Sequence, residues 1–337
     1  MMKRRYSLVS IYCPLLIILL TLCSGGRTPT TQAAPPFTRW AYYVPDDKRA
    51  FTSLQAHARA LDTVVPDLWR LHEDGRITAR MDVAAIRQLR ATGVQVMPMV
   101  QKISWHDKLP TFWTNRAART RAAERLTALV VAGNYPGLHF DIEHIPHDAE
   151  AALQSFVFDL AARLHARNKL FTIALPAKSA AADWYPEFNY ANLGSVADVV
   201  VIMAYDHGYA GGEPAPVAPL PWVKSVVQYT VERIPPSKVL LGVPWYGYDW
   251  NITTDALASY VSWPAASAWG KGRYDAERHA MTLTYHQGSE YHMVWYENAR
   301  SISAKNQIAV AYGLRGWAAW RLGYEDPALW KALTPRR

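Results

Sequence analysis

The chain has very little cysteine. Of its 337 residues only Cys13 and Cys23 are cysteines, and both lie within the first 34 positions. The rest of the chain therefore forms no internal disulfide. Also missing are a G-x-G-x-x-G sequence and a phosphate-binding loop after any strand-like run, which argues against a nucleotide-binding open sheet. No dense basic run is present, so the sequence does not point to nucleic acid as a partner.

Metal-ligand spacing is a further absence. His139, His144 and His147 lie close in sequence to Asp141 and Glu143, but the chain has no H-x-H or H-E-x-x-H pattern. On an extended strand, residue 144 would point away from residue 143. The spacing therefore does not favour a metal site, and a metallohydrolase is the weaker alternative.

The first 34 residues are typical of a targeting segment. Lys3, Arg4 and Arg5 precede an apolar run over 8–22, which is shorter than the ~20 residues that a membrane-spanning helix needs. A Thr/Gly/Pro-rich stretch follows, with small residues at 33–34. We predict a signal peptide and linker over 1–34 and a secreted protein, extracellular or cell-wall associated. Membrane attachment is expected only if this segment stays uncleaved.

Charge and aromatic content give a weaker indication. The formal net charge is +8, of which the first 34 residues carry +4, so the remainder is only mildly basic and compatible with an anionic cell wall. Tryptophan (14) and tyrosine (19) outnumber phenylalanine (8). Rings that carry a polar group suit wet surfaces such as sugar-binding clefts.

Beyond residue 34, strand-like and helical patterns alternate. Eight such units predict an α/β fold of the (β/α)8 TIM-barrel type over 35–337, and a doubly wound open sheet is the alternative. The expected strands cover 39–44, 63–71, 94–101, 137–143, 170–177, 198–206, 238–245 and 316–322. The expected helices cover 52–61, 82–91, 116–133, 148–168, 222–233, 299–313 and 327–333.

One segment interrupts this alternation. Residues 248–298, between the seventh and eighth strands, contain two β-like runs at 281–286 and 291–296. We predict a small α+β insertion at the barrel mouth.

The fourth strand carries the most informative residues. Strand alternation places His139, Asp141 and Glu143 on one face and apolar residues on the other. A buried charge is costly without a partner, so acids at the C-terminal end of a barrel strand suggest catalysis. Acids, tyrosines and tryptophans also end the sixth, seventh and eighth strands, which is what a glycan cleft needs.

The spacing of the two acids constrains the mechanism. Asp141 and Glu143 are roughly 7 Å apart at the backbone by strand rise. They approach from the same side, whereas ordinary glycosidases place two carboxylates on opposite sides of the bond. They therefore suit a proton donor and a helper that tunes its pKa, which leaves the nucleophile to be supplied, and the substrate is one source.

Four motifs resemble glycoside hydrolase family 18, the chitinase-like barrels, over nearly all of residues 37–335. The family signature D-G-x-D-x-D-x-E matches at its last two acids within 136–143. Met203–Asp206 matches M-x-Y-D, and Gly242–Gly247 matches the seventh-strand motif. The stretch Gly316–Pro327 resembles the bacterial branch associated with spore-cortex and cell-wall hydrolysis.

The resemblance implies cleavage of β-1,4 linkages in N-acetylglucosamine glycans, chitin or peptidoglycan, with retention assisted by the substrate's acetamido group. In that scheme Glu143 is the acid and base, and Asp141 stabilises the acetamido nitrogen. Tyr205 binds the acetamido carbonyl, Asp206 supports that site and Trp320 forms the floor. The other expected substrate-contact residues are Met203, Tyr246, Trp245, His139, Tyr43, Trp69 and Trp250. The resemblance implies no metal or cofactor, and we expect a monomer.

His139 departs from the family pattern, which has Asp or Asn there. A protonated His139 would lower the pKa of Asp141, whereas a neutral one would donate a hydrogen bond. We expect activity with an altered pH optimum. A glycan-binding lectin on the same barrel is the alternative function, although such proteins typically lack the acid found at Glu143. The sequence does not separate chitin from peptidoglycan or endo from exo cleavage.

Overall fold

The computed structural model describes residues 36–103, 107–254 and 256–333. The predicted signal peptide and linker at 1–34 lie outside the described residues. None of the helices within the described ranges is both long and apolar enough to cross a bilayer.

Eight parallel strands form a closed barrel, because β1 pairs with β15 on one side and with β2 on the other. This confirms the predicted TIM barrel. Short β3 (Ile77–Ala79) pairs antiparallel with β2, and β4 (Gln95–Val96) pairs parallel with it. The eight barrel strands are β1 (Thr38–Tyr43), β2 (Thr63–Leu71), β5 (Met99–Lys102), β6 (Gly137–Phe140), β7 (Leu170–Pro176), β8 (Val199–Met203), β9 (Val239–Pro244) and β15 (Gly316–Trp320).

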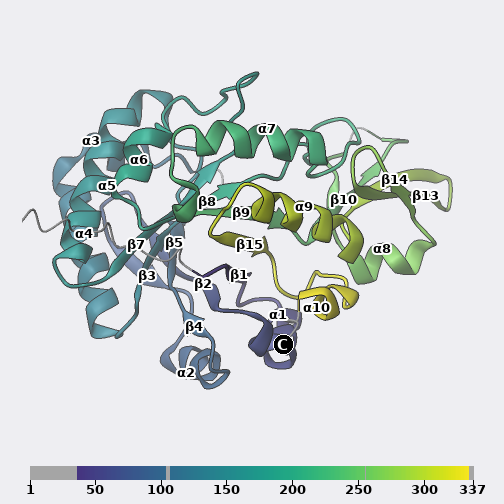
Figure 1. Ribbon diagram of the computed structural model, residues 1–337. Helices are drawn as coiled ribbons and strands as arrows, with labels where there is room; N and C mark the ends of the chain where they lie inside the picture. The colour runs from purple at the N-terminus through teal and green to yellow at the C-terminus, as the bar shows by residue number, and fades with distance from the viewer. Residues whose placement is uncertain (1–35, 104–106, 255, 334–337) are drawn as a thin grey trace, which may run out of the picture. The chain divides into compact units, whose positions relative to one another are not determined.

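Helices connect and cover these strands, and α9 lies against β9 and β15 (Figure 1). Two helix starts follow from local chemistry: the Asp82 carboxylate accepts from Ala85 N at 2.8 Å, and Asn115 Oδ1 accepts from Ala118 N. The helices are α1 (Lys48–His57), α2 (Val83–Ala91), α3 (Pro110–Thr114), α4 (Arg116–Ala132), α5 (Glu150–His165), α6 (Tyr190–Val196), α7 (Leu220–Val231), α9 (Ala299–Ala311) and α10 (Ala328–Leu333), with 3-10 turns at Ala58–Ala60, His147–Ala149 and Pro236–Lys238.

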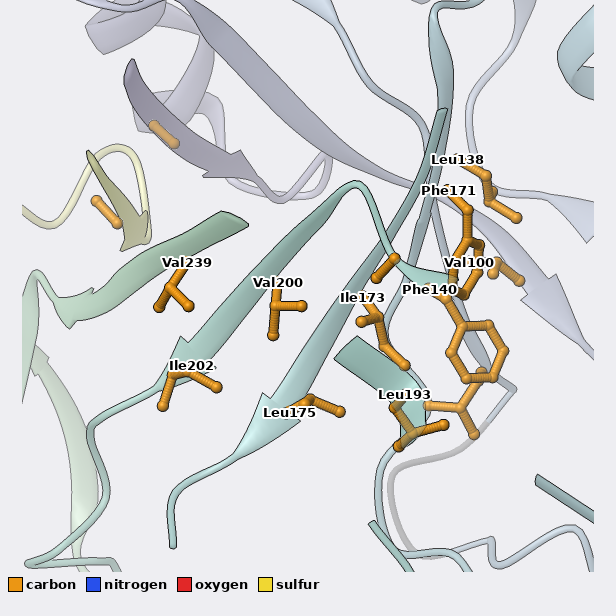
Figure 2. Close-up of a cluster of buried hydrophobic side chains, with 14 of the residues drawn as sticks. Val100, Leu138, Phe140, Phe171, Ile173, Leu175, Leu193, Val200, Ile202 and Val239 are labelled. Carbon is orange, nitrogen blue, oxygen red and sulfur yellow. The ribbon is translucent and has the colours of Figure 1, made fainter. Parts of the chain in front are cut away.

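Strand alternation divides the core into two layers. Figure 2 shows the layer between strands and helices, where Leu138 and Phe140 of β6 lie beside Phe171 and Ile173 of β7. The barrel interior forms a separate apolar cluster of Trp40, Tyr42, Val65, Met97, Met99, Val199, Val201, Leu240 and Ala318. His139, between Leu138 and Phe140, therefore points into the barrel.

The insertion is a second, five-stranded antiparallel sheet in the order β11-β10-β14-β13-β12. Tyr248, Trp250 and Trp295 cluster on one face, whereas Val261 and Val294 cluster on the other, where β11 and β14 contact α8. The elements are β10 (Tyr246–Asn251), β11 (Ser259–Ser262), α8 (Trp263–Trp269), β12 (Arg273–Asp275), β13 (Ala280–Gln287) and β14 (Glu290–Tyr296). This sheet confirms the α+β insertion between strands seven and eight, and it begins at residue 246 because β10 follows directly on β9.

Several strands are shorter or more broken than their sequence patterns predict. The third is divided into β4 and β5 around Pro98, whose ring nitrogen has no N–H for the ladder. The fourth ends at Phe140 and the sixth at Met203, so the acids expected at strand ends lie in the loops that follow. Asp141 still donates its N–H to the Val100 carbonyl at 3.1 Å, so its backbone continues the direction of β6.

Candidate active site

Acids and phenols from several barrel strands come together beyond the C-terminal ends of those strands. The group comprises Gln101 and Lys102 of β5, Asp141 and Glu143 after β6, Tyr205 and Asp206 after β8, Tyr246 and Tyr248 of β10, and Trp320 of β15. The charges of Asp141, Glu143 and Asp206 all act on the Tyr205 phenol, so these four side chains lie close enough to interact electrostatically.

Among the described residues, the Asp141 carboxylate has one hydrogen-bond partner. Only 4% of the residue is exposed, and Gln101 Nε2 donates to Asp141 Oδ2 at 2.8 Å. Asp141 Oδ1 is buried and has no hydrogen-bond partner among the described residues. Burial raises the pKa of Asp141 to about 6, and the Gln101 hydrogen bond opposes that rise. Asp141 therefore ionises near neutrality and keeps one oxygen available for a donor.

Glu143 is suited to proton donation. Burial of its carboxyl group raises its pKa well above the usual value, and the charges of Asp141 and Asp206 raise it further. The Lys102 ammonium opposes this rise, and its Nζ donates to the backbone carbonyl of Glu143 at 2.8 Å. A raised pKa helps a carboxyl group to hold the proton that general acid catalysis requires.

Asp206 is fixed by the insertion. Its backbone adopts the left-handed region with φ 59°, which aspartate tolerates better than most residues. Both Tyr246 and Tyr248 of β10 donate their hydroxyls to Asp206 Oδ1, the second at 3.1 Å. Burial raises the pKa of Asp206 and the two tyrosines lower it. This carboxylate is therefore a support of the site, held by phenols on a separate sheet.

Tyr205 and Trp320 contribute the aromatic part. Burial raises the pKa of Tyr205 well above its usual value, so its phenol remains a hydrogen-bond donor, and its ring centroid is 6.3 Å from that of Tyr246. The Trp320 ring lies 5.3 Å from the Tyr42 ring, and its backbone carbonyl accepts from Trp245 N at 2.6 Å. The half-buried indole of Trp320 therefore stands at the top of the barrel interior.

The expected substrate contact of His139 is wrong. The residue is 0% exposed, Tyr42 OH lies 2.9 Å from its Nε2, and Thr172 Oγ1 lies 2.9 Å from its Nδ1. Since Thr172 Oγ1 donates to the Leu138 carbonyl at 3.1 Å, it accepts from His139 Nδ1–H, and His139 Nε2 accepts from Tyr42. Burial lowers the pKa of His139 to about 3, so the ring is neutral and does not lower the pKa of Asp141 by charge.

Trp69 and Tyr43 also differ from the expectation that they contact substrate. Both belong to the core between barrel and helices, where Trp69 packs edge-on against Tyr135 with ring centroids 5.8 Å apart. The pairing of β2 with β5 shifts register between Asp67 and Trp69, which is a β-bulge. The bulge turns the Trp69 side chain away from the barrel interior, a change that simple alternation does not predict.

Trp245 also differs from the expectation that it contacts substrate. It is 1% exposed and packs against Trp317 and Trp330, with ring centroids 5.9 and 5.2 Å away. Because consecutive residues of an extended chain point to opposite faces, Tyr246 reaches Asp206 while Trp245 faces the helices.

The remaining expected contacts are buried close to the site. Met203 ends β8 and is buried at 7% exposure. Trp250 is 4% exposed and donates its Nε1–H to the Gly212 carbonyl at 2.8 Å, which ties the insertion to the loop after β8. Tyr246 donates its hydroxyl to Asp206 Oδ1.

Sequence reasoning missed Gln101, Lys102, Tyr42 and Tyr248. A signal was present for the first three, because they lie at or next to the C-terminal ends of expected barrel strands, where a barrel of this kind places its active groups. Tyr248 lies in the insertion, where no periodicity points toward Asp206. Within the ranges that the structure describes, no cluster of His, Cys, Asp and Glu is arranged to hold a metal ion.

Comparison with known proteins agrees with this geometry. The family model described as Glycosyl hydrolases family 18 matches residues 37–325. The uncharacterized glycosylase YvbX of Bacillus subtilis (strain 168) is 26% identical over 308 residues, which cover 86% of this chain and 89% of that protein.

The cortical fragment-lytic enzyme of the same bacterium is 33% identical over 210 residues, 58% of this chain and 48% of the enzyme, so the match spans about half of it. A crystal structure of chitinase from Chromobacterium violaceum has a TM-score of 0.81 at 28% identity, covering 88% of this chain and 97% of that one.

Proposed function

The chain belongs to glycosyl hydrolases family 18, and on that basis we propose that this glycoside hydrolase cleaves β-1,4 linkages of N-acetylglucosamine-containing glycans, peptidoglycan or chitin. Relatives named cortical fragment-lytic enzyme and chitinase support this substrate class. The single observation that carries the catalytic assignment is the Glu143 carboxyl, whose pKa is raised by burial beside the ionisable Asp141.

The proposed reaction proceeds in two steps with retention at the anomeric carbon. Glu143 donates its proton to the leaving glycosidic oxygen while the acetamido oxygen of the substrate attacks C1 and forms a cyclic intermediate. Asp141 Oδ1, which is buried without a partner among the described residues, accepts from the acetamido N–H. Glu143, now ionised, removes a proton from water as that water opens the intermediate at C1.

Participation of the substrate is favoured by the state of the third carboxylate. Asp206 accepts hydroxyl hydrogen bonds from Tyr246 and Tyr248 at Oδ1, and these bonds lower the nucleophilicity of the carboxylate. The phenol of Tyr205, kept protonated by burial, is then free to donate to the acetamido carbonyl as charge develops there.

The test compares wild type with Glu143→Gln and with Glu232→Gln, an exposed surface control that pairs with Arg233. Each is incubated with chitin oligomers and with purified peptidoglycan, and the products are followed by mass spectrometry and by NMR of the newly formed anomer. We expect wild type and Glu232→Gln to release products that first appear as the β-anomer. We expect Glu143→Gln to bind oligomers and lose cleavage by about 10²–10⁴-fold. Binding by all three proteins without cleavage by any would establish the lectin alternative instead.

Two further expectations join this proposal. The charged and apolar pattern of the first 34 residues supports export, and cell fractionation with N-terminal sequencing of the mature protein tests it. We also propose a monomer, for which light scattering of the purified protein is the measurement.

A further inference from the structure

Two consecutive residues at the end of β5 reach the two acids of the neighbouring loop. Gln101 Nε2 donates to the Asp141 carboxylate at 2.8 Å, and Lys102 Nζ donates to the Glu143 backbone carbonyl at 2.8 Å. Consecutive strand residues point to opposite faces. Gln101 therefore holds the loop after β6 from inside the barrel, through the Asp141 side chain. Lys102 holds the same loop from the other face of the strand, through the Glu143 backbone.

We propose that Gln101 and Lys102 are positioning residues that clamp the acid loop, with Gln101 serving as the partner of Asp141 that residue 139 does not provide. This inference rests on the proposed function, because it assigns a role in the same reaction. Neither residue touches the reacting atoms in the proposed scheme, so both act through Asp141 and Glu143.

The position of His139 makes Gln101 necessary. Both ring nitrogens of His139 are engaged, by Tyr42 and by Thr172, below the level of the acids. β5 pairs with β6 in the register Met99 opposite His139, so the end of β5 runs beside the loop that carries Asp141. An amide donates to Asp141 Oδ2 but does not share a proton as a carboxylic acid would. Gln101 thus fixes the carboxylate through Oδ2, while Oδ1 has no partner among the described residues.

Lys102 adds an opposite charge near the two acids. It is 5% exposed, and its ammonium favours the ionised form of both Asp141 and Glu143. The other groups that act on these two acids are Asp67, Arg70 and Asp206, and the phenols nearby that respond to their charge are Tyr42, Tyr185, Tyr205 and Tyr260. Since Lys102 is bonded to backbone, its removal both frees the loop and removes this charge.

The experiment records kcat and kcat/KM against pH for wild type, Lys102→Met, Lys102→Arg and Gln101→Leu. Lys178→Met is the matched control, because Lys178 is a buried lysine of the loop after β7 that pairs with Asp183. Folding of each variant is checked by its melting temperature. Carboxyl 13C NMR of Asp141 and Glu143 gives the same two titrations without any need for turnover.

We expect Lys102→Met to move both limbs of the pH profile upward by roughly one unit, because a nearby opposite charge lowers a carboxyl pKa by about that much. Lys102→Arg should restore most of the shift. Gln101→Leu should move only the acid limb upward, because only Asp141 loses a hydrogen bond, and Lys178→Met should leave both limbs in place.

The proposal would be wrong if wild type and Lys102→Met had the same pH profile and if the fall in kcat equalled that of Lys178→Met. Lys102 would then have a purely structural role. A protein that cleaves no glycan would overturn the proposed function alone. In that case the 13C titrations still decide whether Gln101 and Lys102 govern the two acids.

Discussion

Polar residues on one face of the fourth strand have opposite environments at two levels of the barrel. We call the interior around His139 the floor, and the level of Asp141 and Glu143, beyond the strand ends, the rim. At the floor, His139 is fully buried, has a partner at each ring nitrogen and has a pKa lowered to about 3 by burial. At the rim, two and four residues later, Asp141 keeps one buried oxygen unpartnered among the described residues, and the pKa values of Asp141 and Glu143 are raised. Buried polar groups are normally satisfied, so the rim departs from the rule where chemistry is expected.

This difference shows which part of the barrel stabilises the fold and which part destabilises it. A satisfied neutral network specifies the packing of the barrel interior. Buried acids with raised pKa values destabilise the folded state once they ionise, and that cost is tolerated at functional sites. The variants below are chosen so that floor and rim respond in different observables.

The largest effect is expected at the rim from Asp141→Asn. Turnover should fall by about 10²–10³-fold, because a fixed negative charge no longer faces the acetamido nitrogen. Stability should change in the other direction. The folded-state pKa of about 6 exceeds the ordinary 3.8, so the native state binds a proton more tightly between those values and loses stability as pH rises through 6.

Removing the carboxyl should therefore stabilise the protein by about 1–3 kcal/mol at pH 7 and leave stability nearly unchanged at pH 4. Urea unfolding of wild type and Asp141→Asn at pH 4, 5.5 and 7 measures this, with the exposed Glu232→Gln as control. If wild type and Asp141→Asn differed in unfolding free energy by the same amount at every pH, folding would not raise the pKa of Asp141.

The next largest effect is expected at the floor from His139→Asn. The shorter side chain loses at least one of the two ring hydrogen bonds and leaves a small cavity, which together cost about 2–3 kcal/mol. The limbs of the pH–rate profile should stay within experimental error of wild type, because a neutral ring carries no charge for Asp141 to sense. A shift of either limb by half a unit would mean that floor and rim are electrostatically coupled after all.

The division between floor and rim could be predicted only in part from the sequence. The eight strands and the motif residues Asp141, Glu143, Tyr205 and Asp206 follow from periodicity and spacing along the chain. The ends of β6 and β8 do not, because a strand stops where its neighbours stop pairing with it. The outward turn of Trp69 depends on a bulge against β5, and the pairing of Asp141 with Gln101 depends on the register between β5 and β6. These are properties of two segments together, which a single sequence does not display.

A smaller effect at the floor is expected from Tyr42→Phe. The ring remains to pack against Trp320, but His139 Nε2 loses its donor inside the barrel. A buried acceptor left without a partner costs about 1–2 kcal/mol. Thermal unfolding should detect this loss, while kcat/KM on chitin oligomers should change by less than about threefold. If His139→Asn already removes the same bond, the double variant should cost less than the sum of the two single changes.

The smallest effect is expected from Tyr248→Phe, where the insertion meets the rim. Asp206 Oδ1 loses its hydroxyl donor at 3.1 Å but keeps that of Tyr246, so one of two similar interactions remains. A hydrogen bond with this redundancy is worth about 0.5–1 kcal/mol, which corresponds to about a two- to fivefold fall in kcat. Because Tyr248 lowers the pKa of Asp206, its removal should raise that pKa, and a 13C titration of Asp206 follows the change directly. Tyr291→Phe is the matched control, since Tyr291 lies in the same sheet and its ring packs at a tilt against His286 instead. A hundredfold loss from Tyr248→Phe alone would mean that its hydroxyl contacts the substrate, and the insertion would then belong to the catalytic rim and not to its support.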